Sequence, residues 1–351
     1  MNMRAQANNK KFVYASIGVV FLSLLAVMAV NVAIDPLGII WPKWISHPLE
    51  KAKSKVGRRD ATAMRIVTAA EYDSNPNPYC IIGDSRAGMF SVENIKKITG
   101  DEYYKFVFGG ATAMEITEVF WYTARRVKLK KVYLVIPFNI YNDNKINSIF
   151  REAAPLSQNW IRYASSSYVL RISLGVVIKA LLGIQTGSNV ALDAGDIMSD
   201  KEAFWKYQIG AVERSYSIYI EPKIILKRLK EIKEYCDSQG IKLVFVIPPS
   251  HLDLQKVISK YNLDDEFVQF KKDLRSLSTT YDYDYPNRCA RSRQLFDDPW
   301  HGKKLLYRVL EEDIFESRLD DLDAACAQKE VEVMAQEMAE KDRHESEHHM
   351  E

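Results

Sequence analysis

The first feature of the hydrophobic pattern is a run of 23 residues without a charge, from Phe12 to Ile34. A helix of this length spans about 34 Å at ~1.5 Å per residue, which is enough to cross the hydrocarbon core of a bilayer. A cleaved signal peptide or a helix buried in a soluble core are the alternatives, but the run is long for a signal peptide and no clean small-x-small site precedes Asp35. We therefore expect an uncleaved transmembrane anchor at 12–34.

The orientation of this anchor follows from the basic residues around it. The segment 1–11 carries three basic side chains and the α-amino group, which slightly outnumber the three lysines within about 20 residues after the run. We expect a cytoplasmic tail at 1–11, a single pass through the inner cell membrane, and the body on the extracytoplasmic side.

After residue 78, short apolar runs alternate with amphipathic helical patterns. The runs that indicate buried strands are Tyr79–Gly83, Tyr103–Phe108, Val132–Ile136 and Ile241–Ile247. A capping box, Thr112-x-x-Glu115, opens one predicted helix, and Pro222 and Gly240 bound another. Continuous apolar strands separated by helices are typical of a parallel sheet covered on both faces. The pattern therefore predicts an α/β fold.

This alternation stops between residues 144 and 221. The segment is long and rich in Ser and aromatic residues, and its apolar patch at 168–184 contains Arg171 and Lys179, which disfavour a second membrane span. A helical insertion is the simplest interpretation. It could be a lid, an interfacial helix lying on the membrane, or additional core.

These boundaries divide the chain into an anchor, a body and a tail. We expect a juxtamembrane segment at 35–78, an α/β domain at 79–318 with its insertion at 144–221, and a charged acidic tail at 319–351, helix-prone and either solvated or disordered. From Glu311 to the end there are fifteen acidic and four basic residues, whereas the preceding body has 44 basic and 31 acidic residues.

A basic body suits nucleic acid, an anionic membrane surface or an acidic polymer. Because the body is predicted to lie outside the cytoplasm, we expect no nucleic-acid partner. The basic run at 51–59 would then lie against lipid headgroups or an acidic polymer, or form a solvated helix face.

The four cysteines include no CxxC pair, which disfavours a zinc ribbon or a disulfide scaffold. Cys236 and Cys289 could form a disulfide in an oxidising compartment, although nothing in the sequence brings them together. We expect neither a cofactor nor a metal ion.

Candidate chemistry appears where the first predicted strand runs into Gly83-Asp84-Ser85-Arg86. In parallel sheets, functional residues gather at the carboxyl ends of strands. A serine at such a turn presents its hydroxyl at a helix N-terminus, where backbone N–H groups can also stabilise an oxyanion. Asp and Ser are equally common there as N-caps without a catalytic role.

The second candidate motif is Asp298-Pro299-Trp300-His301. Of the three histidines that lie before the tail, only His301 has a carboxylate at this spacing. His251 follows the fourth strand and could approach the site, but a structural role is favoured. We predict that His301 opens the last helix, that its Nε2 lies within hydrogen-bond reach of Ser85 Oγ, and that Asp298 binds the other ring nitrogen.

The two motifs together resemble the first and last blocks of the SGNH/GDSL hydrolase superfamily, over roughly residues 80–315. The sequence Asn-x-x-x-Asp-Pro-x-Gly at 31–38 further resembles the membrane-anchored branch associated with acylation of bacterial cell-envelope polysaccharides. The resemblance implies a three-layer α/β/α sandwich around a parallel sheet of about five strands. It also implies Ser85 as nucleophile, His301 as general base and Asp298 as the carboxylate that orients it.

The middle blocks of that superfamily supply the remaining oxyanion donors. Its glycine block implies Gly109 or Gly110, and we choose Gly110 because it directly precedes the turn into the capped helix. Its asparagine block, usually Gly-x-Asn-Asp, lacks its glycine here; the candidates are Asn139, which has the right offset from the strand, and Asn142, which precedes Asp143. The predicted oxyanion hole is the Ser85 and Gly110 N–H groups with Asn139.

The resemblance implies a serine O-acyl esterase or O-acetyltransferase, a hydrolase or acyltransferase that acts on cell-envelope or exported polysaccharide through an acyl-serine intermediate. Its expected partners are an acyl-carrying saccharide or envelope polymer and a membrane protein that exports acyl groups. The alternatives are a lipid esterase or thioesterase, with the apolar insertion as acyl pocket, and a non-catalytic SGNH-fold component of an envelope-polymer assembly.

Overall fold

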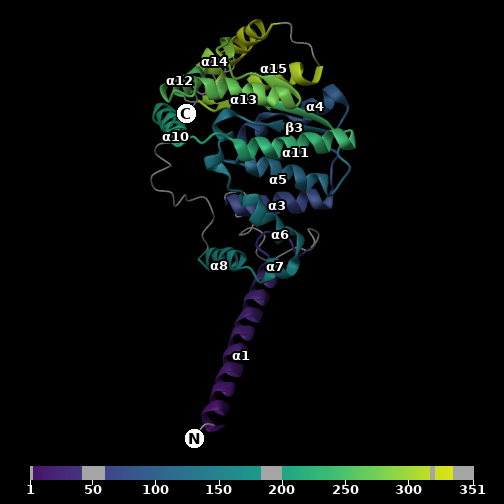
Figure 1. Cartoon of the computed structure of the whole chain (residues 1–351), viewed down its shortest axis with the longest axis vertical. Helices are drawn as coiled ribbons and strands as arrows, with labels where there is room; N and C mark the ends of the chain where they lie inside the picture. The colour runs from purple at the N-terminus through teal and green to yellow at the C-terminus, as the bar shows by residue number, and fades with distance from the viewer. Residues whose placement is uncertain (1–2, 42–59, 183–199, 317–320, 335–351) are drawn as a thin grey trace, which may run out of the picture. The chain divides into compact units, whose positions relative to one another are not determined.

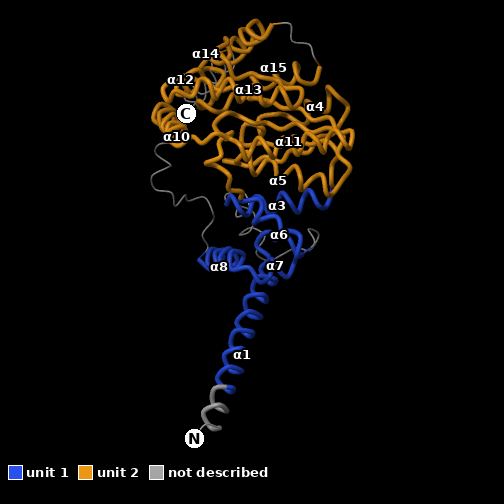
Figure 2. The backbone as a smooth tube through the Cα atoms, viewed as in Figure 1, with its two compact units in different colours: residues 1–75, 149–190 blue, residues 76–148, 191–351 orange. Residues whose placement is uncertain are grey.

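The computed structural model describes residues 3–41, 60–182, 200–316 and 321–334. The chain forms two compact units (Figure 2). The stem unit comprises residues 1–75 and 149–190, and the sheet unit comprises residues 76–148 and 191–351. The predicted insertion at 144–221 is therefore divided, because residues 149–190 belong to the stem unit and residues 144–148 and 191–221 to the sheet unit. The basic run at 51–59 lies outside the described residues.

The stem unit is helical. Its helices are α1 (Met3–Ile34), α3 (Ala61–Ser74), α6 (Ile149–Gln158), α7 (Trp160–Ala164) and α8 (Ser167–Leu181). Within the described residues, one helical segment, Lys10–Ile34 of α1, is long and apolar enough to cross a membrane. Its large apolar side chains between Phe12 and Leu25 are 43–73% exposed, whereas a core helix would bury them.

The carboxyl end of α1 is joined to α7 and α8 by polar side chains. Asp35 adopts a left-handed conformation (φ 40°), and its carboxylate accepts four hydrogen bonds. The donors, at 2.9–3.0 Å, are the N–H groups of Ile39, Ile40 and Trp41 and the hydroxyl of Tyr163. The Asn31 amide donates to the carbonyls of Ala164 and Ser166 at 2.7 and 3.1 Å. The Asn and Asp of the 31–38 motif thus form a fixed junction between α1 and the helices α7 and α8.

The sheet unit contains five parallel strands in the order β2-β1-β3-β4-β5. They are β1 (Tyr79–Gly83), β2 (Tyr104–Val107), β3 (Lys131–Val135), β4 (Lys242–Ile247) and β5 (Thr279–Asp282). The first four are the predicted strands to within one residue at each end. The fifth was not predicted, because its sequence, TTYD, has no apolar run and lies at the sheet edge. The order reverses between β1 and β3, where a crevice opens at the carboxyl ends of the strands.

Both faces of the sheet are covered. Its helices are α4 (Val92–Thr99), α5 (Ala113–Ala124), α10 (Lys201–Tyr216), α11 (Lys223–Gln239), α12 (Leu252–Lys260), α13 (Asp264–Leu277), α14 (Arg288–Arg291) and α15 (Lys304–Glu311) (Figure 1). On one face, Ile81, Tyr133 and Val244 pack with residues of α4 and α15. The alternate strand residues, including Ile82 and Phe245, are equally buried, and α5 and α11 contact β1 and β4.

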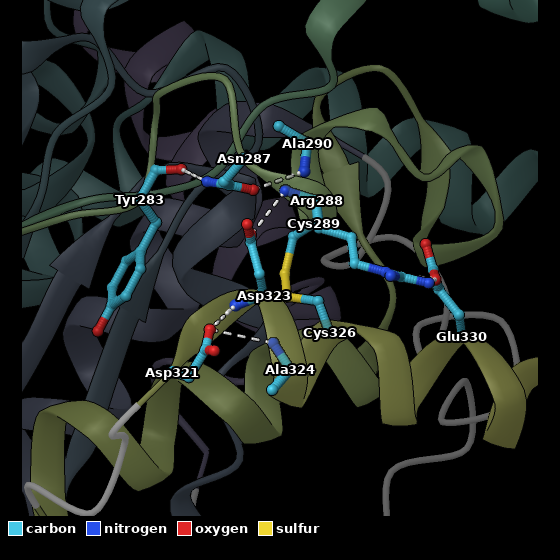
Figure 3. Close-up of a disulfide and its surroundings, with 10 residues drawn as sticks. All are labelled: Tyr283, Asn287, Arg288, Cys289, Ala290, Asp321, Asp323, Ala324, Cys326 and Glu330. Atoms are coloured by element: carbon cyan, nitrogen blue, oxygen red, sulfur yellow. Dashed lines mark hydrogen bonds and ion pairs between the residues drawn. A yellow bond between two sulfur atoms is a disulfide. The ribbon is translucent and has the colours of Figure 1, made fainter.

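The C-terminal part of the chain is tied to the sheet unit by a disulfide between Cys289 of α14 and Cys326 (Figure 3). The disulfide that Cys236 and Cys289 could have formed is absent, because Cys289 pairs with Cys326 and Cys236 is a buried free thiol on α11. Cys326 and Val333 are buried on the helix at 322–334, where they pack against Leu295. This part of the predicted solvated tail is therefore attached and packed, and residues 335–351 lie outside the described residues.

Candidate active site

Three adjacent strands end at one cleft. Ser85 follows β1, Gly110 follows β2 and Asn139 follows β3, so the order β2-β1-β3 brings the three residues to the same edge of the sheet. All three line a cleft of about 410 Å³ together with His301. The sequence-predicted site residues are thus gathered in one place, with Asp298 directly behind His301.

The turn that presents Ser85 depends on the glycine before it. A Cβ atom on Gly83 would lie 2.7 Å from the Cβ of Ala87 and 2.8 Å from that of Val135, closer than side chains can approach. Gly83 therefore lets the chain leave β1 and turn tightly against β3. Asp84 then caps the short 3₁₀-helix at Ser85–Met89 by accepting from the N–H of Arg86 at 3.0 Å.

Ser85, His301 and Asp298 form a continuous chain of hydrogen bonds. Ser85 Oγ lies 2.7 Å from His301 Nε2, and His301 Nδ1 lies 2.7 Å from Asp298 Oδ2. An ionised carboxylate only accepts hydrogen bonds, so Nδ1 carries the proton and Nε2 accepts from the serine hydroxyl. The predicted proximity of these three residues is confirmed, although Ser85 and His301 are 216 positions apart in the sequence.

The local structure around His301 differs from the prediction. His301 does not open a helix: it lies on β7 (His301–Gly302), which pairs antiparallel with β6 (Phe296–Asp298), and α15 begins at Lys304. Asp298 Oδ1 accepts from the N–H groups of Trp300 and His301 at 2.8 and 3.1 Å, which stabilises the turn between the strands. One carboxylate thus shapes the turn and orients the imidazole.

His251 has the structural position that we expected. It is buried at the N-terminus of α12, its ring Nδ1 accepts from the N–H of Asp253, and its backbone N–H donates to the carbonyl of Pro299 at 3.0 Å. Burial lowers the pKa of His251, which favours the neutral ring whose Nδ1 accepts from Asp253. His251 therefore supports the turn that carries His301 without entering the cleft.

The groups around Ser85 form a candidate oxyanion hole. Gly110 has φ +68° in a turn closed by a bond from the Ala111 N–H to the Phe108 carbonyl at 3.1 Å, and a residue with a side chain would be strained there. Asn139 lines the cleft, and its Oδ1 accepts from the Arg86 guanidinium at 2.7 Å, so this bond leaves its NH₂ group available as a donor. The N–H groups of Ser85 and Gly110 have no hydrogen-bond partner among the described residues.

The alternative, Asn142, is placed differently. It is fully buried, does not line the cleft, and its Oδ1 accepts from the N–H groups of Asn144 and Ile220, both at 3.0 Å. It therefore fixes the chain after β3, and of the two candidates Asn139 is the one that lines the cleft.

Two basic side chains of the cleft had no predicted role. The Arg86 guanidinium is almost fully buried, forms an ion pair with Asp84 at 2.6 Å, and lies 5.0 Å from the ring centre of Trp300. Lys145 Nζ donates to the carbonyl of Asn139 at 3.3 Å, and burial, followed by the nearby charge of Arg86, lowers the pKa of Lys145. Arg86 adjoins the serine in the sequence motif, but Lys145 has no sequence signal that we recognise.

The cleft thus combines a hydroxyl, a histidine that is hydrogen-bonded to a carboxylate, and N–H groups without a partner among the described residues, which is an arrangement suited to acyl transfer. No group of three or more His, Cys, Asp or Glu side chains in the described part of the chain is placed to hold a metal ion. No protein-family model matches the chain, and no curated protein matches it either.

Proposed function

We propose that this chain is a membrane-anchored serine O-acyl esterase or O-acetyltransferase of the SGNH type, acting on cell-envelope or exported polysaccharide. The observation that carries the proposal is the pair of 2.7 Å contacts from Ser85 through His301 to Asp298 at the end of β1. The parallel sheet, with helices against both faces, is compatible with the three-layer α/β/α sandwich of that superfamily.

In the proposed reaction, Ser85 Oγ attacks the carbonyl carbon of an acyl ester while its proton passes to His301 Nε2. The N–H groups of Ser85 and Gly110 and the amide of Asn139 stabilise the oxyanion of the tetrahedral intermediate. The C–O bond to the carrier then breaks, and the leaving oxygen takes the proton from His301. Water or a sugar hydroxyl next attacks the acyl carbon while its proton passes to His301 Nε2. The bond from the acyl carbon to Ser85 Oγ then breaks and Oγ takes the proton from His301, which releases an acid or a new ester and restores the serine.

The lining of the cleft favours a short acyl group on a polar carrier. Polar side chains such as Asn147, Gln208 and Lys145 share the cleft with apolar surface from Ala111 and Ile140. A lipid esterase or thioesterase would need an extended apolar channel for its acyl chain. This difference supports the polysaccharide acyl-ester reading over the lipid alternative.

Two features support a membrane-anchored protein with an extracytoplasmic body. The exposed apolar surface of α1 needs a bilayer to cover it. The disulfide Cys289–Cys326 fits an oxidising compartment, since cytosolic thiols are kept reduced. A reporter fused after Ile40 should be active only when it is exported; activity in the cytoplasm would contradict this orientation.

The proposal is tested by covalent labelling of the serine. A fluorophosphonate probe should label the full-length chain in detergent, and intact-mass analysis after incubation with an acetyl ester should detect acetyl-Ser85. Ser85→Ala and His301→Ala should lose both signals, whereas Ser238→Ala, at an exposed position on α11, should keep them. A correctly folded wild type that forms no adduct would favour the non-catalytic assembly role, and preference for long over short acyl esters would favour a lipid esterase.

A further inference from the structure

Helix α8 carries apolar side chains on two opposite faces. The buried face consists of Val169, Ile172, Ser173 and Val176. About half a turn away, at ~100° per residue, lie Leu174, Ile178 and Leu181, which are 47%, 54% and 80% exposed. The outer face of a helix in a soluble protein is normally polar. These three residues, the outer stripe of α8, therefore indicate an apolar or interfacial environment outside the protein.

The N-terminus of α8 lies beside the carboxyl end of α1, at the depth where the hydrocarbon core of a bilayer crossed by α1 would end. Asn31 of α1 donates to the carbonyls of Ala164 and Ser166, immediately before α8, and Figure 2 shows α7 and α8 beside the carboxyl end of α1. About 20 helical residues cross a hydrocarbon core. Counting back from Asn31 by this length leads to Phe12, next to the two lysines that precede the apolar run.

The composition of α7 and α8 agrees with this level. From residue 159 to residue 182 the chain has three basic residues and no acidic one. Trp160, the first residue of α7, is 59% exposed, and Trp41, beyond the end of α1, is 42% exposed. Exposed tryptophans and basic side chains beside an apolar face are characteristic of helices that lie in the headgroup region.

We propose that the outer stripe of α8, with Trp160 of α7, lies in the interfacial layer of the membrane leaflet from which α1 emerges. The stem unit is then attached to the membrane twice, by a spanning helix and by a helix lying in the interface. This inference rests on α1 spanning a membrane, but it is independent of the acyl chemistry of the sheet unit. A second copy of the chain or another protein covering the stripe would contradict it.

The test measures the depth of a nitroxide attached at Ile178→Cys, with the full-length chain in nanodiscs of phosphatidylcholine and phosphatidylglycerol. Collision with oxygen, which concentrates in lipid, is compared with collision with a water-soluble nickel chelate. Val20→Cys on α1 reports on the membrane span, and Val268→Cys on α13 is an exposed apolar control, with native exposures of 68% and 49% against 54% for Ile178. The unsubstituted chain, whose free cysteines are buried, gives the labelling background.

We expect the oxygen-to-nickel ratio at position 178 to exceed that at 268 several-fold, and Leu174→Gln with Leu181→Gln to lower it. A ratio at 178 equal to that at 268, with position 20 in lipid, overturns the inference and leaves the span intact. Protection of position 178 from both reagents indicates a protein cover and overturns it as well. A water-exposed label at position 20 would refute the span and the inference together.

Discussion

Replacing Arg86 by lysine tests whether a buried ion pair holds the proposed oxyanion donor in place. The Arg86 guanidinium donates to Asp84 Oδ2 at 2.6 and 3.1 Å and to Asn139 Oδ1 at 2.7 Å. A lysine keeps a positive charge beside Asp84 but lacks the planar fork that reaches both acceptors at once. The Asn139 amide would then be free to rotate away from the cleft.

The size of the effect follows from these contacts. Loss of one oxyanion donor lowers kcat by about 10²–10³, equivalent to roughly 2.7–4 kcal/mol of transition-state stabilisation. We expect Arg86→Lys to lower kcat by much of this factor, with little change in KM. Removing the charge altogether would leave the Asp84 carboxylate buried and unpaired, at a cost of about 3–5 kcal/mol in the free energy of unfolding. Lysine is therefore the informative replacement.

The assay is a double-mutant cycle on hydrolysis of a chromogenic acetyl ester. It compares kcat and KM of the wild type, Arg86→Lys, Asn139→Ala and the double variant. Independent losses of about 10² each would multiply to about 10⁴, whereas a residue that acts through Asn139 gives a double variant no worse than about 10². Arg275→Lys, which changes an ion pair with Asp282 in which Arg275 is 56% exposed, is the matched control.

Multiplication of the two losses would refute the positioning role of Arg86. So would an increase in KM at unchanged kcat, which would mean that Arg86 binds the ground-state substrate. Thermal unfolding of each variant shows whether the fold is retained, so that a loss of activity is not mistaken for a loss of structure.

Three further predictions concern stability. Gly83→Ala introduces a Cβ within 2.8 Å of two neighbouring Cβ atoms and should lower the free energy of unfolding, measured by chemical denaturation, by roughly 1–3 kcal/mol. Gly109→Ala, whose Cβ would have no atom within 4 Å, should leave the free energy of unfolding unchanged, and equal effects of the two substitutions would contradict the steric argument. Burial raises the pKa of Asp284 above 3.8, so the folded state keeps a proton that the unfolded chain releases, and stability falls as pH rises above that value. Asp284→Asn should therefore gain stability relative to the wild type as the pH rises above about 4, and a difference that does not change with pH would refute this. Cys326→Ser opens a loop with a sequence separation of 37, worth roughly 3–4 kcal/mol, and should expose the helix at 322–334 to limited proteolysis; unchanged cleavage would show that packing alone holds it.

The sequence predicted the parts of the fold that have strong local signals. Four strands were found because parallel strands buried on both faces are continuously apolar. The start of α5 followed from Thr112, whose hydroxyl accepts from the N–H of Glu115 at 3.1 Å. The end of α11 followed from Gly240, which has φ +67°. The rule that parallel strand ends share one edge placed Ser85, whereas His301 was chosen for its spacing from Asp298 and for the resemblance to the superfamily.

The remaining features depend on contacts between distant segments. β5 is a short, half-exposed edge strand without an apolar run. The Asp298–His301 spacing suits a helical turn and a hairpin equally, and the hairpin is selected by hydrogen bonds from the Asp298 carboxylate to the turn. The partner of Cys289 depends on where the helix at 322–334 docks, which its acidic sequence did not indicate.

The fixed junction at Asp35 also determines how α1 moves relative to α7 and α8. A flexible linker at the end of α1 would let the following segments reorient freely relative to this helix. Here the last turn of α1 is bonded through Asn31 to the chain before α8, and the following turn is wound around one carboxylate. With α1 spanning a bilayer, as proposed, these hydrogen bonds make α7 and α8 move together with α1 when it tilts. Replacing Asp35 would place a pivot at that point.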